Sequence, residues 1–444
     1  MTGTRARATP SITPSARPAR ASARGVLAPA LACLALGLGG AAAAGETAAR
    51  PAGCRDVPPG ADLQALIDAA AEGEALCLAP GRYAGPLRIG HRVVLWAPPE
   101  AILYSSGEGT TLRIEGDRAA LLGLTIDGSG ARFDLLDAAL HVQAREVRVE
   151  GVTIRNAVFG ILVERSERVV LRGNQVIGDP TQTLGLRGDS IRLWETRDSV
   201  VEENLVRDGR DVVVWYSPRN RIARNTVERS RYGTHLMYSS DVAIEGNRFL
   251  GNVTGVFVMY SRGVELRDNV VADSAGAAGI GLGAKESGNL RVVGNQFLHN
   301  TVGIYLDTSP LYPEDRNLFE DNSFRFGEVG VVFHSSEERN SFRGNRFADN
   351  QDPVRVEGGG DALGVEWRGN AFDDYAGYDL DGDGIGDVAY ELRSLSSELI
   401  GEVPALAFFR GTQALALAEA IGRIVPIFEP KLLLVDPTPR VAQR

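Results

Sequence analysis

Met237 and Met259 stand 22 residues apart, and His235 precedes Met237 by two positions. Thioether sulfur and imidazole nitrogen are donors that suit Cu(I), a soft ion. In an extended strand, residues two positions apart point to the same face. These three side chains therefore form one copper-binding site if the chain places Met237 beside Met259 in neighbouring strands.

The sequence repeats itself with a core period of 22 residues. Each repeat holds a Gly, a short alternating apolar run, a polar turn that often contains Ser, a second apolar run, and an Asn before an apolar residue. Such a period predicts stacked β-coils, and the leucine framework of a leucine-rich repeat is absent. We expect an all-β, right-handed parallel β-helix over residues 83–372. The asparagines that end the phrases are Asn174, Asn204, Asn225, Asn247, Asn269, Asn295, Asn322, Asn345 and Asn370.

Two residue types predict ladders that run through the coils. We expect each recurring Asn to occupy a turn that tolerates a left-handed backbone, with its amide bonded to its copy in the next coil. Tyr216, Tyr238 and Tyr260 also recur at 22 residues. Strand alternation predicts that these tyrosines point inward at the strand ends and stack in the core.

The same alternation predicts which side chains face out. Ile304 and Leu306 point inward if Asp307 points to solvent, and this frame places His235, Met237 and Met259 on the outer wall. It leaves three interpretations open: a Cu(I) site, an apolar strip that docks a partner, or residues packed under a loop. The strip would also include Trp194, Trp215 and Phe257.

Residues 373–393 carry an acidic loop that resembles the front of an EF-hand calcium loop. Its carboxylates stand at loop positions 1, 3, 5 and 9, and a Gly stands at position 6. Tyr390 replaces the usual Glu at position 12. We expect a structural Ca²⁺ site here, and the alternative is a solvated Asp-Gly turn. The expected ligands are Asp379, Asp381, Asp383, the backbone of Ile385, and Asp387.

The N-terminal region predicts export. Residues 1–44 hold five arginines and an apolar run and end in the four alanines 41–44, as in a cleavable signal peptide. Residues 45–82 are expected to form an N-terminal cap with an amphipathic helix over residues 62–71. In an oxidising compartment Cys54 and Cys77 are expected to form a disulfide in this cap, and the alternative is a pair of metal ligands.

The C-terminal segment, residues 394–444, is predicted to be a helix and a Pro-punctuated tail. Its apolar stretch suits a helix that docks on a transporter, lies at the bilayer interface, or packs back on the open end of the solenoid. The formal charge of −10 argues against nucleic acid as a partner.

Several phrases together resemble the NosD family, periplasmic maturation proteins of nitrous oxide reductase. They are Trp215-Tyr-Ser-Pro-Arg-Asn220, Arg231-Tyr-Gly-Thr-His-Leu-Met-Tyr-Ser-Ser-Asp241, Gly255-Val-Phe-Val-Met-Tyr-Ser261, Gly281-Leu-Gly-Ala-Lys-Glu-Ser287 and Tyr378-Asp-Leu-Asp-Gly-Asp-Gly-Ile-Gly-Asp387. The resemblance implies a periplasmic protein associated with the inner membrane through a transporter. It implies four partners: an ABC transporter membrane subunit, its ATPase, a copper-carrying lipoprotein and nitrous oxide reductase. It assigns no copper ligands.

An enzyme is the main alternative, because many β-helices act on acidic polysaccharides. A lyase or epimerase needs paired carboxylates, or bound Ca²⁺ with a basic residue. Lys285 is the one lysine within the coils, and the outward acids Asp211 and Asp307 do not share a column. We therefore expect a non-catalytic protein, with a carbohydrate-active enzyme or sugar-binding module as the alternative function and a purely structural stalk as a further one.

Overall fold

The computed structural model describes residues 49–336, 338–358, 360–409, 412–424 and 430–441. The predicted signal peptide, residues 1–44, lies outside these residues, as do residues 410–411, 425–429 and 442–444 of the C-terminal segment. All the described residues belong to one compact unit.

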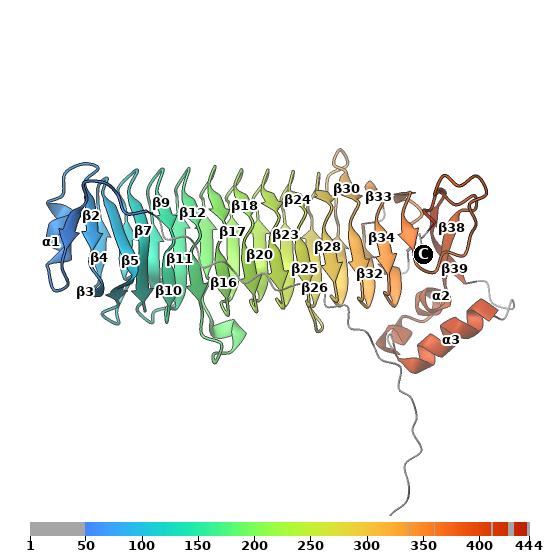
Figure 1. Ribbon diagram of the computed structural model, residues 1–444. Coiled ribbons are helices and arrows are strands. Elements are labelled where there is room, and N and C mark those ends of the chain that lie inside the picture. The colour runs from blue at the N-terminus through green and yellow to red at the C-terminus, as the bar shows by residue number, and fades with distance from the viewer. Residues whose placement is uncertain (1–48, 337, 359, 410–411, 425–429, 442–444) are drawn as a thin grey trace, which may run out of the picture. The chain divides into compact units, whose positions relative to one another are not determined.

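Short strands joined by turns make up each coil of this unit, and successive coils stack side by side (Figure 1). One coil holds β20 (Tyr232–Met237), β21 (Ala243–Glu245) and β22 (Arg248–Leu250). Each pairs in parallel with its counterpart in the next coil, β23 (Thr254–Met259), β24 (Glu265–Arg267) or β25 (Val270–Ala272). The prediction of a parallel β-helix is confirmed.

The coil strands form two sheets. A 12-stranded sheet carries the candidate site. Its strands are β4 (Leu87–Ile89), β6 (Leu112–Ile114), β8 (Ala138–Val142), β11 (Phe159–Glu164), β14 (Ile191–Trp194), β17 (Asp211–Trp215), β20, β23, β26 (Ile280–Lys285), β29 (Val302–Asp307), β32 (Val329–His334) and β35 (Asp352–Glu357). The 25-stranded sheet holds β21, β22, β24, β25, β1 (Arg55–Val57), β2 (Ala75–Leu78), β3 (Gly81–Ala84), β5 (Val94–Tyr104), β7 (Ala120–Asp127), β9 (Arg148–Glu150), β10 (Thr153–Arg155), β12 (Val170–Arg172), β13 (Gln175–Ile177), β15 (Val200–Glu202), β16 (Leu205–Arg207), β18 (Arg221–Ala223), β19 (Thr226–Glu228), β27 (Arg291–Val293), β28 (Gln296–Leu298), β30 (Asn317–Glu320), β31 (Ser323–Arg325), β33 (Asn340–Arg343), β34 (Arg346–Ala348), β36 (Glu366–Arg368) and β37 (Ala371–Phe372).

One continuous apolar core fills the coils, because the inward residue of each strand stacks on its counterpart one coil away. Leu236, Val258 and Leu306 are fully buried in this way. Aromatic residues replace aliphatic ones in the C-terminal coils, where Phe324 stacks on Phe347 and Phe347 stacks on Phe372. No coil can bury its inner face alone, so stability depends on stacking.

The recurring asparagines form a buried ladder. The side-chain amide of Asn225 donates to Asn247, and that of Asn247 donates to Asn269, each at 3.0 Å. The expected left-handed backbone lies one residue earlier, as in Arg224 (φ 53°) and Asp268 (φ 55°). That placement of the turn was wrong because the preceding residue reverses the chain, which leaves the Asn free to point inward.

The expected inward tyrosines are in fact on the outside. Tyr216 and Tyr238 are 44% and 48% exposed, and their rings stack at 5.2 Å. They adopt a left-handed backbone, with φ of 53° and 52°, which ends the strand and breaks the two-residue alternation on which the prediction rested. The next residue points inward instead, and Ser217 and Ser239 are fully buried.

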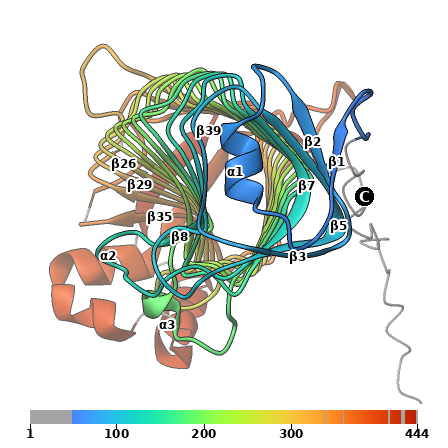
Figure 2. The same ribbon diagram turned by 90° about the vertical axis from the view of Figure 1, so that its left-hand side faces the viewer.

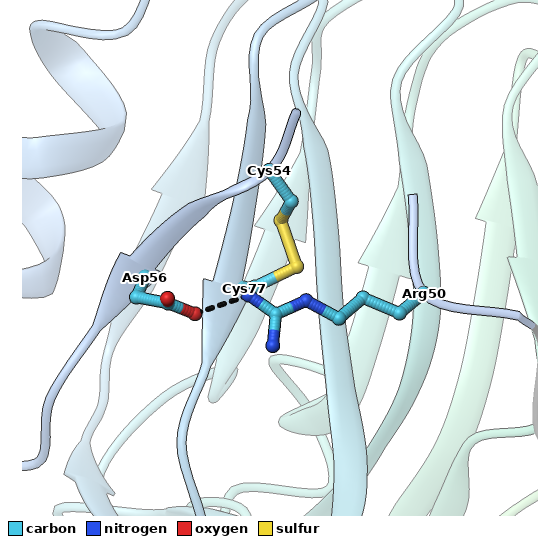
Figure 3. The surroundings of a disulfide bond; sticks show 4 residues. All are labelled: Arg50, Cys54, Asp56 and Cys77. Carbon is cyan, nitrogen blue, oxygen red and sulfur yellow. Dashed lines mark hydrogen bonds and ion pairs between the residues drawn. A yellow bond between two sulfur atoms is a disulfide. The ribbon is translucent and has the colours of Figure 1, made fainter. Parts of the chain in front are cut away.

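The N-terminal end of the solenoid is covered by the segment around α1 (Leu63–Asp68) (Figure 2). The helix is shorter than the predicted 62–71, and the Asp62 carboxylate accepts a hydrogen bond from the Ala65 amide at its start. Cys54 and Cys77 form a disulfide with their Cα atoms 5.8 Å apart (Figure 3). Cys54 directly precedes β1, and Cys77 lies in β2, the neighbour of β1 in the sheet.

The C-terminal end is covered by an antiparallel pair, β38 (Tyr390–Ser394) and β39 (Lys431–Asp436). Tyr390 stacks on Phe372 at 3.9 Å and extends the aromatic stack of the core. Between the two strands the chain forms α2 (Leu395–Glu402), η2 (Pro404–Phe409) and α3 (Gln413–Ile424). The predicted Pro-punctuated tail therefore contains a strand, because Asp436 and its neighbours complete the last coil.

Candidate metal site and docking surface

An outward-facing row of side chains crosses the 12-stranded sheet. Successive strands place its members in register, so that Met237 lies beside Met259. We call this the outer row. Its members, from β14 to β32, are Trp194, Trp215, Met237, Met259, Lys285, Asp307 and His334. Neighbouring strands are ~4.8 Å apart, so Met237 and Met259 are adjacent on the outer wall.

His235 lies two residues from Met237 on the same face, inside an aromatic cage. Its ring is 4.7 Å from the ring of Tyr232, 5.3 Å from Trp215 and 6.2 Å from Phe257, measured between centroids. These rings leave the residue only 7% exposed. The sequence placed His235 outside the core correctly, but it did not indicate that aromatic side chains cover it.

The two ring nitrogens of His235 differ in their surroundings. Nε2 lies 3.4 Å from the sulfur of Met259. Nδ1 is buried and has no hydrogen-bond partner among the described residues. Burial lowers the pKa of His235 to about 4, while the Asp211 carboxylate opposes this shift and Arg231 adds to it. The ring is therefore neutral at neutral pH, which is the form that binds a metal ion.

This donor set fits a soft monovalent cation. The 3.4 Å between Nε2 and sulfur allows both atoms to bind one ion with bonds of ~2.0–2.3 Å. The whole sequence contains three methionines, and the third is Met1. Both internal methionines are thus neighbours in one row, beside one of five histidines.

A strand irregularity explains why the sequence did not predict Tyr232 as a member of the aromatic cage around His235. The pairing between β17 and β20 shifts between Asp211 and Val213. The irregularity brings Tyr232 to the same face as His235, although the two are three residues apart. The Tyr232 amide donates to the Asp211 carboxylate, which also forms an ion pair with Arg231.

The carboxylates around the cage are held by arginines. Asp189 and Asp211 are 2% and 1% exposed, and Arg210 donates to Asp189 at 2.8 Å. Burial raises the pKa of Asp189, and Arg210 opposes that shift. Arg192 lies over the ring of Trp194 at 4.5 Å. This network fixes the surroundings of the cage and engages these acids in ion pairs.

The residues of the predicted docking strip fall into two rows. Trp194 and Trp215 belong to the outer row, with ring centroids 5.7 Å apart, whereas Phe257 lies beside His235 in the neighbouring row. The exposed tyrosines Tyr216 and Tyr238 adjoin the outer row, and Trp194 packs edge-on against Tyr216 at 5.3 Å. Aromatic surface therefore surrounds the thioethers on the outer wall.

The acidic loop forms a separate cluster after the last coil. Ligand atoms of Asp379, Asp381 and Asp383 all lie within 4.8 Å of one another. The Gly384 amide donates to Asp379 and holds the pKa of that carboxyl below its usual range. Asp387 accepts a hydrogen bond from the Leu380 amide at 2.7 Å, and the Ile385 amide donates to Asp383. The expected Ca²⁺ site remains a proposal.

If the loop binds Ca²⁺, the ion will stabilise the C-terminal cap that the loop precedes. We expect millimolar Ca²⁺ to raise the thermal unfolding midpoint by about 2–4 °C through mass action. The Asp379→Asn variant should lose that rise, because one carboxylate is neutralised. Calorimetric scans with Ca²⁺ and with a chelator measure both values. An equal rise in wild type and variant would contradict the proposal.

Comparisons with known proteins identify relatives over most of the chain. Residues 173–377 match the family model described as periplasmic copper-binding protein (NosD). A probable ABC transporter binding protein NosD from Stutzerimonas stutzeri is 25% identical over 384 residues, which cover 79% of this chain and 83% of the relative. The protein of the same description from Pseudomonas aeruginosa is 27% identical over 381 residues, with 79% and 84% covered.

Solved structures share the fold. The A-module of the mannuronan C-5 epimerase AlgE6 from Azotobacter vinelandii is 17% identical, with a TM-score of 0.54 over 69% of this chain and 94% of that module. The catalytic domain of a GH87 α-1,3-glucanase is 12% identical, with a TM-score of 0.54 over 70% and 67%. At these identities the likeness concerns the β-helix alone.

Proposed function

Because this chain belongs to the NosD family of periplasmic copper-binding proteins, we propose that it is a non-catalytic accessory protein for copper-centre assembly in nitrous oxide reductase. In this proposal copper is cargo, held as Cu(I) on the outer wall by His235, Met237 and Met259. The family description supports copper in general. The ligands and the oxidation state follow from the donor set.

One observation carries the assignment of the site. The buried imidazole of His235 has its Nε2 atom 3.4 Å from the sulfur of Met259, and its Nδ1 atom has no hydrogen-bond partner among the described residues. Met237, the second thioether, pairs in register with Met259. Burying an imidazole whose one hydrogen-bond contact among the described residues is a thioether costs free energy, and a metal bond at Nε2 would offset part of that cost. When the metal binds through Nε2, Nδ1 carries the proton of the neutral ring. The aromatic cage excludes water, which favours a weakly hydrated soft ion over Zn²⁺ or Ca²⁺.

The proposed partners are an ABC transporter membrane subunit with its ATPase, a copper-carrying lipoprotein and the reductase. The relatives are named ABC transporter binding proteins, which supports the first of these. No helix among the described residues is long and apolar enough to span a membrane. The segment from α2 to α3 exposes apolar side chains, and we propose that it attaches the protein to the membrane subunit and so to the inner membrane. Those side chains are Val403, Phe408, Phe409, Leu417 and Ile421.

The proposal that the protein is not an enzyme rests on the state of its acids. General acid–base chemistry needs a carboxyl group that is available to exchange protons with a substrate. Asp189 and Asp211 are instead engaged by Arg210 and Arg231 beside the cage. The alternative is a carbohydrate-active enzyme or sugar-binding module, and an assay against acidic polysaccharides tests it.

The decisive experiment measures copper in the partner. Nitrous oxide reductase is produced with its accessory proteins, with and without this one, and copper per reductase is measured by atomic spectrometry. We expect copper to fall when the protein is missing, and wild type to restore it. Unchanged copper would overturn the proposed function. An assay against acidic polysaccharides would then test the alternative.

The pH profile of copper binding tests whether His235 is a ligand. Binding requires a neutral ring, and a proton competes only near or below a pKa of about 4. We expect Cu(I) affinity to change by less than about twofold between pH 7.5 and 5.5, whereas an exposed histidine ligand would lose about tenfold over that range. Competition with a chelator whose own pH dependence is known measures this.

The Phe257→Ala variant provides the matched control for the pH profile. Opening the cage returns water to the imidazole, so the pKa of His235 should rise toward its ordinary value. Acid sensitivity should then appear above pH 5.5. A steep pH profile in the wild-type protein would contradict the assignment of His235 in its buried, neutral form.

A further inference from the structure

Sulfur is confined to two places in the described part of the chain. Cys54 and Cys77 are joined in a disulfide at the N-terminal cap. The remaining sulfur atoms belong to Met237 and Met259, since Met1 and Cys33 lie within residues 1–48. Met237 and Met259 therefore carry all the reduced sulfur of the described residues, and they are neighbours in the outer row.

Both thioethers face the outside of the solenoid and are partly accessible. Each ends its strand, β20 or β23, with intermediate burial, whereas the preceding Leu236 and Val258 are fully buried in the core. Part of each methionine is thus open to solvent, so a small oxidant can approach both residues without unfolding of the coils. The reactivity of a methionine toward peroxide follows its exposure.

We propose that Met237 and Met259 form a redox-modification site, whose oxidation to methionine sulfoxide closes the metal site. The proposal rests on the proposed function, because it takes His235 and these thioethers as the metal ligands. The oxidant is hydrogen peroxide. Each sulfur loses two electrons and gains one oxygen atom, and the peroxide is reduced to water.

The chemistry of the product explains why the site would close. A sulfoxide presents a polar oxygen in place of the soft thioether donor that Cu(I) prefers. His235 Nε2, 3.4 Å from the Met259 sulfur, is placed to donate a hydrogen bond to that oxygen. A neutral imidazole can carry its proton on either nitrogen. The hydrogen bond would hold the proton on Nε2 and so remove the nitrogen lone pair from the metal.

The bound metal should in turn protect the sulfur. Oxidation uses a sulfur lone pair, and coordination occupies a lone pair of each thioether. The metal-free protein is then the sensitive form, and the loaded protein is the resistant form. Oxidation would withdraw empty carrier molecules from copper transfer, and the enzymatic reduction of methionine sulfoxide would return them.

The test compares the metal-free protein with the Ag(I)-loaded protein during treatment with hydrogen peroxide. Ag(I) is a soft monovalent ion that does not cycle with peroxide as Cu(I) does. Peptide mass spectrometry follows the addition of one oxygen to each methionine. We expect oxidation to be at least about tenfold slower in the loaded protein, and Ag(I) affinity to fall at least about a hundredfold after oxidation. Methionine sulfoxide reductases of both stereospecificities should restore binding.

The Met237→Leu/Met259→Leu variant separates this inference from the proposed function. Methionines that resist peroxide at concentrations that oxidise free methionine would overturn the inference and leave the function untouched. Oxidised protein that binds Ag(I) as tightly as before would also overturn it. If the leucine variant bound the ion equally well, the proposed ligands would be wrong too.

Discussion

Replacing Met237 and Met259 together with leucine will lower the affinity for Cu(I) by at least about a hundredfold, which is ~2.7 kcal/mol of binding free energy. Leucine has nearly the volume of methionine and no sulfur. The substitution therefore removes two of the three proposed donors. His235 would remain, but one imidazole in a dry cage cannot replace the coordination that a soft ion finds in two thioethers.

The fold should survive this double substitution. Swaps between leucine and methionine usually cost less than ~1.5 kcal/mol even in cores, and these side chains are half-buried on the outer wall. Equilibrium unfolding of the variant checks the fold. Competition with a chromophoric Cu(I) chelator measures the affinity.

Trp194→Leu provides a matched control for the double variant. Trp194 belongs to the same outer row, two strands before Met237, and carries no metal donor in the proposed site. We expect it to leave Cu(I) affinity unchanged and to weaken binding of a protein partner. If Trp194→Leu lowered Cu(I) affinity as much as the methionine variant, the row would act as an apolar surface alone, and the copper assignment would be wrong.

Changing Asn247 to aspartate will destabilise the solenoid by about 3–5 kcal/mol. The Asn247 side chain is fully buried and accepts two hydrogen bonds from Asn225. It also donates to the Ile222 carbonyl and to the Asn269 side-chain oxygen. An aspartate keeps the two accepted bonds but cannot donate, so a buried carboxylate would face two oxygen atoms.

Asp436→Asn is the reverse substitution, made at the C-terminal end of the ladder. At the C-terminal end of the ladder the Asp436 carboxylate accepts from the backbone and the side chain of Asn370, both at 2.9 Å, and from the Thr438 amide. Every hydrogen bond that the structure gives this side chain is an accepted one. An asparagine keeps one oxygen for the Asn370 bonds, but its NH2 group would face the backbone amides of Gly369 and Thr438, so we expect a loss of about 1–3 kcal/mol. Urea unfolding measures the loss in both variants, and an Asn247→Asp variant as stable as wild type would contradict the ladder.

The sequence predicted the fold because the repeat is a property of the whole chain. A period near 22 with two-residue alternation specifies both the stacking and the inner face, and Ile304 and Leu306 are buried as this pattern predicts. Alternation fails where a strand ends. Tyr216 and Tyr238 were placed inside because a left-handed backbone at the corner could not be seen in the sequence. The tail strand β39 was missed for a related reason, since one strand without a repeat partner has no periodic signal.

The candidate site was predicted in part. Spacing alone brings Met237 and Met259 together, and the two-residue offset places His235 on their face. The aromatic cage depends on an irregularity between β17 and β20 that reorients Tyr232. The shift reflects one extra residue in the coil of β20, since Asp211 and Tyr232 are 21 residues apart and Val213 and His235 are 22, but the spacing does not show which face Tyr232 takes. The orphaned Nδ1 of His235 and the shift of its pKa follow from the packing of this cage.

The coils also set a length scale. Four strand steps separate Met259 from Glu357 in β35, the last strand of the 12-stranded sheet. At ~4.8 Å per step the thioethers stand ~19 Å from that end. The stacked coils thus set the distance between the proposed copper site and the C-terminal end, where we propose that the protein attaches. Adding or removing one coil between Met259 and β35 would change this distance by ~4.8 Å and leave the proposed ligands unchanged. The number of coils therefore sets the distance that a partner docked at the C-terminal end must span to reach the proposed copper site.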